Sequence, residues 1–389
     1  MTQRTAIFPA PEATAVAALM SGGPTDPIAA VTHPDPYAYY AALRAKAGLH
    51  WFEDRKLWAL VSAPGVTTAL HMPAARVRLP SEPIPPFLQG SPAGELFGRL
   101  ARMSDGTPHD ARRGRTMLLM HKLTGEFVAG GAVQVIEAVA ASWRQRRDGP
   151  SLNEWVRTLP VMSILAALGV APHAREPMLA CIDTWVAGLS PLATDTKRAA
   201  AIDALDGLLL LLEAHGVHGL DDAAAHVAVL MQPHEATAGL IGAGLLRLAA
   251  EEGLCASAIA GTLRWDLFGQ EVLRHDPPIQ NTRRIMATDT TIEGRPFRAG
   301  DTVLLVLASA ARDLPPHEAP DAFRLDRLQR TALSLGAGAH ACPGGPAALA
   351  IASCAWQHVA AQAGPGGLEA LARGVTWRPS VNARIPMFA

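Results

Sequence analysis

One long apolar stretch constrains the fold of this chain more than any other feature. It runs from Asp221 to Glu252 and reads "DDAAAHVAVLMQPHEATAGLIGAGLLRLAAEE". The two aspartates suit a helix N-terminus, and the residues that follow are apolar on nearly every side of a helix. Such a helix is stable only when other elements surround it, so we expect it to cross the middle of a large helical domain.

Composition agrees with a single large domain. The chain has 389 residues, 49% of them hydrophobic, and we expect one domain over residues 1–389, a β-containing N-terminal part merged with a helical main part. Its four cysteines form no CxxC pair, which argues against a disulfide scaffold or a structural zinc. A net charge of -1 gives no attraction to nucleic acid. The N-terminus shows neither a signal peptide nor a membrane-length apolar run, so we expect a cytoplasmic protein without a membrane partner.

Helical periodicity dominates the pattern of apolar residues. The segments that show it are residues 36–47, 111–123, 131–146, 153–168, 199–215 and 221–252. Strand signals cluster in "RRIMATDTTIEGRPFRAGDTVLLVLASA", which turns at residues 293–295 and predicts a small sheet late in the chain. Residues 78–94 are rich in proline and glycine, and we expect a long loop there.

A glycine-rich turn, "LSLGAGAHACPGGPAA", holds Cys342. Gly336, Gly338 and Gly344 permit positive φ and close backbone approach, so a large flat ligand has room to lie against the turn. From these residues alone Cys342 is either a metal ligand or an apolar filler in a small-residue connection.

A second motif lies upstream in "GQEVLRHDPP". Glu271 and Arg274 are spaced i, i+3 and share a helix face, and the two prolines end the helix. Most such pairs are solvated surface pairs. Arg327, in "DAFRLDR", is placed to complete a buried network that fixes a loop.

The order of these elements is specific: a long central helix, ExxR, a small sheet, FxxxR, then GxGxHxCxG. In this order, and in "HDARRGR" and the ending "RIPMFA", the chain resembles the soluble bacterial members of the cytochrome P450 family over nearly its whole length. The resemblance implies a mainly α fold, the cytochrome P450 fold, with a helical bundle and small β-sheets.

The resemblance also implies a cofactor, haem b (iron protoporphyrin IX). Cys342 then supplies the thiolate ligand of the haem iron, which favours O–O bond cleavage. His109, Arg113, Arg284 and His340 match the positions that pair with the haem propionates, and surface charges are the alternative interpretation. Glu271, Arg274 and Arg327 match the structural network behind the cysteine loop.

The helix over the iron departs from the family pattern. The family usually has an acid followed by threonine, and a gapless comparison places Glu235 at the acid and Ala236 at the threonine, with Thr237 one position late. One position is about 100° of helix rotation, so Thr237 does not replace the missing hydroxyl. Pro233 predicts a kink that frees the carbonyl of Val229.

The sequence allows two interpretations of Gln232 and two of Glu235 on the distal side of the haem. Gln232 lies at the position nearest the iron, where its amide either hydrogen-bonds an iron ligand, a water or a substrate, or folds back onto the freed backbone. Glu235 is either a proton donor or only the partner of a nearby cation.

On the side of the thiolate, the departures from the family pattern affect the electron density on the sulfur and the binding of an electron donor. Pro343 has no N–H for the sulfur, which predicts a more electron-donating thiolate, and Leu335 replaces the usual phenylalanine. No lysine or arginine lies between Cys342 and Arg373, so the redox partner that the family implies, a ferredoxin with its reductase, would depend on Arg112, Arg115 and Lys122.

Three functions follow, all with a small-molecule substrate or ligand. The first is oxygen-dependent monooxygenation of an apolar small molecule in specialised metabolism or catabolism. The second is a peroxide-driven or non-hydroxylating haem-thiolate enzyme, which the absent threonine and Gln232 favour. The third is a haem-based sensor or binding protein without turnover. Arg76 and Arg78 suggest an anionic group on the substrate, although solvated loop charges are the commoner explanation for such residues.

Overall fold

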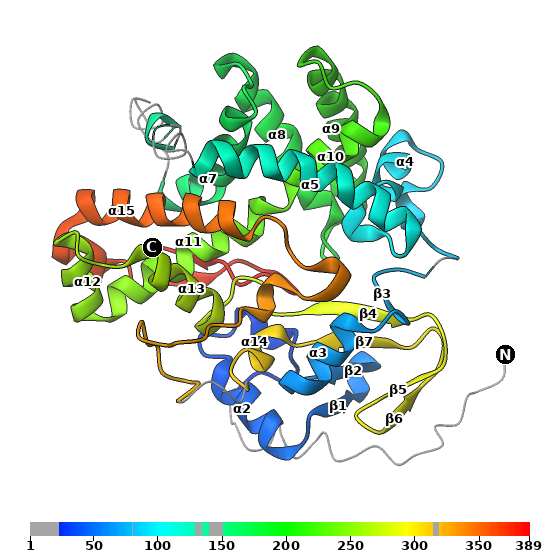
Figure 1. The fold of residues 1–389 in the computed structure, drawn as a ribbon, viewed down its shortest axis with the longest axis horizontal. Coiled ribbons are helices and arrows are strands. Elements are labelled where there is room, and N and C mark those ends of the chain that lie inside the picture. Colours follow the sequence, from blue (N-terminus) through cyan, green and yellow to red (C-terminus); the bar gives the residue numbers. More distant parts are fainter. Residues whose placement is uncertain (1–22, 80, 129–133, 135, 140–150, 314–318) are drawn as a thin grey trace.

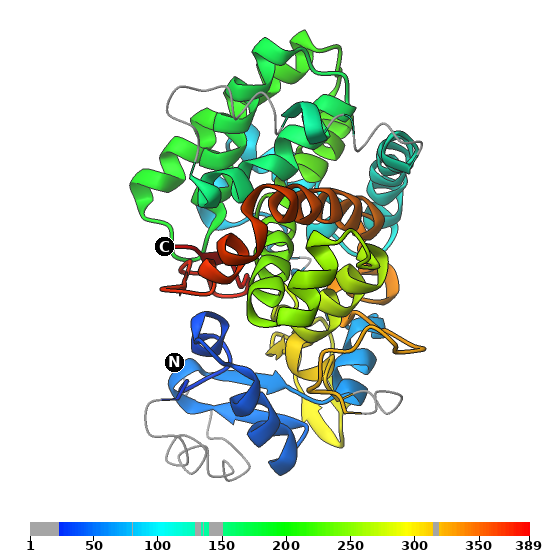
Figure 2. The ribbon, with the colours of Figure 1, turned by 90° about the vertical axis from the view of Figure 1, so that its left-hand side faces the viewer.

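The computed structural model describes residues 23–389 except 80, 129–133, 135, 140–150 and 314–318. It has a helical part and a smaller part that contains a sheet (Figures 1 and 2). The main helices are α2 (Tyr37–Lys46), α3 (Ala63–His71), α4 (Pro92–Gly98), α5 (Thr107–Val128), α7 (Leu152–Ala167), α8 (Pro172–Leu189), α9 (Asp195–Ala214), α10 (Leu220–Met231), α11 (Pro233–Ala250), α12 (Glu252–Ile259), α13 (Trp265–His275), α14 (Leu307–Ala310) and α15 (Gly345–Ala370).

The central helix is present and divided as its proline predicts. α10 ends at Met231 and α11 begins at Pro233, with Gln232 between them in helical conformation. The predicted helix over residues 131–146 falls largely outside the described residues. Sequence periodicity did not indicate α8 or α15, whereas α13 is the helix expected from the Glu271 and Arg274 motif.

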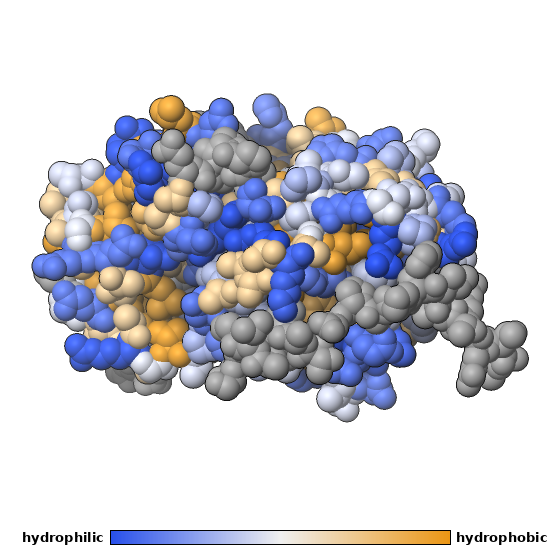
Figure 3. Space-filling view, turned by 90° about the horizontal axis from the view of Figure 1, so that it is seen from below, coloured by the Kyte–Doolittle hydropathy of each residue, from blue (hydrophilic) through white to orange (hydrophobic). Residues whose placement is uncertain are grey.

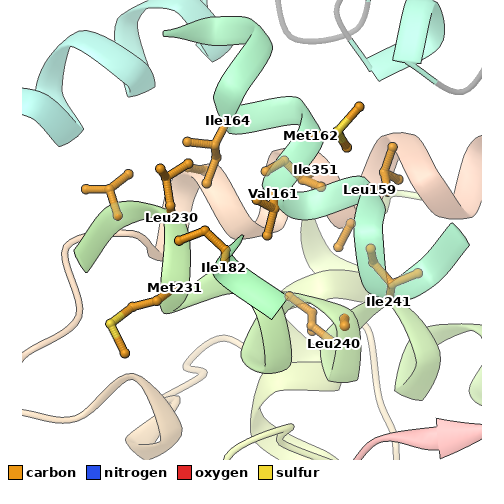
Figure 4. Packing of buried hydrophobic residues seen from close by; sticks show 14 of the residues in the cluster. Leu159, Val161, Met162, Ile164, Ile182, Leu230, Met231, Leu240, Ile241 and Ile351 are labelled. Atoms are coloured by element: carbon orange, nitrogen blue, oxygen red, sulfur yellow. The ribbon is translucent and has the colours of Figure 1, made fainter. Parts of the chain in front are cut away.

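Apolar residues from four helices surround the division between α10 and α11. Figure 4 shows Val161 of α7, Ile182 of α8, Leu230 of α10 and Ile351 of α15 converging there, and all four are buried. The expectation that the Asp221 to Glu252 segment crosses the middle of the domain is therefore confirmed. Burial on all sides holds these two helices in place more than helix propensity does.

The small sheet draws on both ends of the chain. Its strands follow the order β1-β2-β7-β4-β3, and β5 and β6 form a separate hairpin that turns at Glu293 and Gly294. The strands are β1 (Leu49–Phe52), β2 (Leu57–Leu60), β3 (Ala75–Arg76), β4 (Thr282–Met286), β5 (Thr290–Ile292), β6 (Arg295–Phe297), β7 (Thr302–Leu305), β8 (Thr376–Trp377) and β9 (Pro386–Met387). The late strands confirm the sequence prediction. β structure was expected in the N-terminal part, but the individual strands β1, β2 and β3 were not located because they are short.

β2 and β7 pair in parallel and join the N-terminal segment to the helical part. The face that carries this sheet mixes hydrophilic side chains with scattered apolar patches (Figure 3). Among the described residues, no helix combines the length and apolar character that a membrane crossing requires.

Candidate functional site

The cysteine turn leads directly into α15. A 3₁₀ turn over Gly338–His340 precedes Cys342, whose N–H donates to the carbonyl of Leu335 at 2.7 Å. Gly336 and Gly338 have φ of 69° and 63°, conformations that other residues rarely adopt. A Cβ on Gly338 would lie 2.8 Å from the carbonyl oxygen of Leu70, so the turn needs a glycine there to pack against α3.

The surroundings of the Cys342 thiol act on its pKa in two directions. Its side chain is accessible to solvent, yet burial raises the pKa of the thiol because protein atoms surround it. The N–H groups of Gly344 and Gly345 and the positive charge of Arg113 act in the opposite direction and stabilise the thiolate. Pro343 gives the sulfur no donor, as expected, whereas the next two residues do, and the more electron-donating thiolate stays a prediction.

Behind the turn lies a fully buried ion-pair network. The Glu271 carboxylate accepts from Nε and Nη2 of Arg274 at 3.0 and 2.7 Å and from Nε of Arg327 at 3.0 Å. Both guanidiniums also donate to the carbonyl of Ala322. The predicted network is confirmed, and it ties α13 to the segment that precedes the cysteine turn.

The four residues predicted to hold propionates lie near one another. The rings of His109 and His340 are 4.5 Å apart, and Nε2 of His340 lies 2.9 Å from a carboxylate oxygen of Asp105. Arg113 donates to the carbonyl of Ala341 at 2.8 Å, beside the cysteine. Arg284 is buried, which lowers its pKa, and the charge of Asp105 partly offsets that effect. The sequence analysis missed Asp105.

The distal turn holds the remaining predicted residues. Nε2 of Gln232 donates to the carbonyl of Ala228 at 2.9 Å, so its amide is folded back onto the helix and its oxygen can only accept. Glu235 forms an ion pair with Arg378 at 3.7 Å. Ala236 offers no hydroxyl, and Thr237 is buried. The structure therefore favours the less reactive interpretation of both Gln232 and Glu235.

His234 holds the distal turn from behind. Its Nε2 lies 2.6 Å from a carboxylate oxygen of Asp183 on α8, and Arg157 of α7 pairs with the other oxygen of that carboxylate. Neither the histidine nor its partners stood out in the sequence, because a single histidine in an apolar helix carries no spacing signal.

A further cation, Arg102, was also missed. It lies in the 3₁₀ turn Ala101–Met103, seven residues before His109. Its side chain is solvent-accessible, yet burial lowers its pKa, partly offset by the charges of Glu235 and Cys342.

These residues fit a haem. The Cys342 thiol is accessible, and the same region contains four basic side chains and the Asp105 carboxylate. Cationic side chains suit two propionates, and the glycine turn admits a flat ring beside the sulfur. Fold and site together fit the class of mainly helical haem proteins.

Comparisons with known proteins agree. The model of the cytochrome P450 family matches residues 268–354, which include the ExxR motif and the cysteine turn. Cytochrome P450 144 of Mycobacterium tuberculosis is 27% identical over 359 residues, which cover 81% of this chain and 79% of that protein. Cytochrome P450 monooxygenase PikC of Streptomyces venezuelae is 26% identical over 383 residues, 90% of this chain and 89% of PikC. The crystal structure of P450 RauA, complexed with a biosynthetic intermediate of aurachin RE, has the same fold. Its TM-score is 0.74 at 22% identity, and the match covers 96% of this chain and 98% of RauA.

The family model, the curated relatives and the solved structure agree with the resemblance to the cytochrome P450 family, and the predicted fold class is confirmed. Members of the family are typically monooxygenases of bacterial metabolism that contain haem iron, act on small molecules and receive electrons from redox partners.

Proposed function

We propose that the protein is a haem b monooxygenase that inserts one atom of O₂ into an apolar small molecule. The observation that carries the proposal is the Cys342 thiol, which is held in the glycine-rich turn before α15 and is accessible. Electrons would come from a ferredoxin and its reductase. The location that we propose is the cytoplasm.

Each part of the site has a task. The bound haem supplies an iron centre whose thiolate ligand favours O–O bond cleavage. The N–H groups of Gly344 and Gly345 stabilise the Cys342 thiolate, and the Glu271 network keeps the loop rigid. His109, Arg113, Arg284 and His340 would pair with the propionates and fix the orientation of the ring.

Three distal residues, Ala236, Glu235 and Gln232, have no free group that could deliver a proton. Ala236 has no hydroxyl, the Glu235 carboxylate is held by Arg378, and the Gln232 amide is bonded to Ala228. Protons at the distal turn must then come through ordered water, through Thr237 or from the substrate. This arrangement favours the alternative function, a peroxide-driven or non-hydroxylating enzyme, because peroxide brings its own protons and electrons.

Rapid-mixing absorbance separates the two enzymatic functions. The ferric protein is mixed with hydrogen peroxide, and the reduced protein is mixed with oxygen while the ferredoxin system supplies electrons. Bleaching by peroxide, together with an oxygen reaction that accelerates with electron supply, supports monooxygenation. Rapid productive reaction with peroxide, without bleaching, supports the alternative. No turnover under either condition, with spectra that still respond to ligands, indicates a haem-based sensor or binding protein.

The variant Ala236→Thr tests the missing relay. If a hydroxyl is all that is absent, this variant lowers the fraction of electrons lost as hydrogen peroxide. Ala236→Val, which has the shape of threonine without the hydroxyl, does not lower it. Equal losses in both variants would show that protons take another route.

The electron donor has few free cations to bind. Nη1 of Arg115 pairs with Asp222 at 2.7 Å, and Asp221 lies near both Arg115 and Arg112. We therefore expect electron transfer from a ferredoxin to depend only weakly on salt concentration.

A further inference from the structure

Asp105 joins three segments of the chain beside the cysteine turn. One of its carboxylate oxygens lies 2.9 Å from Nε2 of His340, and the other accepts the backbone N–H of Val77 at 3.1 Å. Only 17% of the Asp105 side chain and 15% of the His340 side chain are exposed. The carboxylate therefore ties the loop before α5 and the segment after β3 to the turn that carries Cys342.

The same hydrogen bond fixes the ring of His340. Burial alone would raise the pKa of Asp105, but the bonds from His340 and Val77 and the charge of Arg76 outweigh burial and lower the pKa. An ionised carboxylate can only accept, so Nε2 of His340 donates to it. Nδ1 of the ring, which has no hydrogen-bond partner among the described residues, is then left for another group.

Asp105 brings one negative charge into a group of cations. Arg284 on β4 is buried, and Arg113 donates to the carbonyl of Ala341 at 2.8 Å. Nε of Arg76, the residue before Val77, is buried and has no hydrogen-bond partner in the described part of the chain. These cations suit two propionates, and Asp105 is then a third carboxylate that belongs to the protein and shares them.

We propose that Asp105 is a positioning residue of the haem site, whose carboxylate holds His340 in place and supplies a fixed negative charge that lowers the reduction potential of the haem. Ferric haem carries one more positive charge than ferrous haem, so a negative charge that water screens poorly favours the ferric form. This inference rests on the proposed function only in requiring a bound haem, and it holds for any substrate or oxidant.

Reduction potentials of the haem-loaded protein test the charge. Asp105→Asn removes the charge but keeps the shape of the side chain and an oxygen that accepts from Nε2 of His340. We expect the potential of this variant to shift to more positive values. Asp105→Glu keeps the charge, and its potential should stay close to that of the wild type.

Asp110→Asn is the matched control for the charge. A carboxylate oxygen of Asp110 lies 3.1 Å from Nδ1 of His109, whose ring is 4.5 Å from the ring of His340, but the Asp110 side chain is 77% exposed. Water screens this charge, so the shift should be smaller by about fourfold, the ratio of effective dielectric constants of about 80 in water and about 20 in protein.

The rate of haem transfer to apomyoglobin tests the hold on His340. Asp105→Ala releases the histidine, and we expect transfer about tenfold faster than from the wild type, the lower end of the effect of groups that orient a ligand-binding histidine. Asp105→Asn still accepts from the ring and should transfer haem at the wild-type rate.

The other outcomes contradict the inference. An unchanged potential in Asp105→Asn, or equal shifts in Asp105→Asn and Asp110→Asn, overturns the role of the charge. A shift in Asp105→Glu as large as that in Asp105→Asn does the same, because shape would then set the potential. Equal transfer rates from Asp105→Ala and Asp105→Asn overturn the hold on His340. A wild-type protein that binds no haem refutes the proposed function itself, and the inference falls with it.

Discussion

Removing the Glu271 carboxylate should destabilise the protein strongly. The carboxylate accepts four hydrogen bonds, three from Arg274 and Arg327 and one from the backbone N–H of Arg324 at 3.0 Å. Glu271 and Arg274 are completely buried and Arg327 nearly so. Glu271→Ala leaves the guanidiniums of Arg274 and Arg327 in the interior without this anion, and also that of Arg330, whose Nε lies 3.8 Å from the carboxylate. Breaking a buried pair in this way costs about 3–5 kcal/mol.

A surface pair of the same geometry provides the control. Arg264 donates to both oxygens of Asp266 at 3.0 and 2.7 Å, but both side chains are more than half exposed. Asp266→Ala should cost less than about 1 kcal/mol, as exposed pairs do. Guanidinium chloride unfolding, followed by tryptophan fluorescence and far-UV circular dichroism, gives both values. Similar costs for the two variants would refute the argument that burial, not pairing, sets the magnitude.

Two further predictions concern packing and pH. Gly244→Ala places a Cβ 2.3 Å from the Trp356 ring and should lower the free energy of unfolding by about 1–3 kcal/mol or prevent folding. In Gly114→Ala on α5 the new Cβ meets nothing within 4 Å, so this variant should raise the free energy of unfolding by about 0.5–1 kcal/mol. Equal thermal unfolding midpoints for the two variants would contradict this. Burial, with the charges of Arg312 and Arg247, lowers the pKa of His275 from 6.5 to about 3. The unfolded chain therefore binds the proton first, and the free energy of unfolding should fall by up to about 1.4 kcal/mol per pH unit between pH 6.5 and 3, a component absent in His275→Gln.

Motif order made much of this molecule predictable. The ExxR pair, Arg327 and the cysteine turn are encoded by residue types at fixed spacings, and Pro233 marks the division of the central helix because it has no N–H to donate. Arg102, Asp105 and His234 could not be predicted, since their roles come from neighbours distant in sequence, Glu235 and Cys342 in the first case and Asp183 in the last. The individual early strands could not be located because β1 and β2 have four residues each and β3 has two, too few to show a clear alternation.

The distal turn shows where sequence reasoning stops. The sequence allowed Gln232 and Glu235 either to act on a ligand or to pair within the protein. Only the positions of Ala228 and Arg378 in space decide between these two roles. A side chain that can satisfy either a ligand or the backbone takes the partner that the fold places within reach.

The central claim is that the Cys342 thiolate binds a haem iron. The most direct test is the absorbance spectrum of the purified protein, reduced and exposed to carbon monoxide, beside that of Cys342→Ser. The account predicts a coloured wild-type protein with the red-shifted band of thiolate ligation, and loss of that band in the variant. A colourless wild-type protein, or the same band in Cys342→Ser, would contradict it.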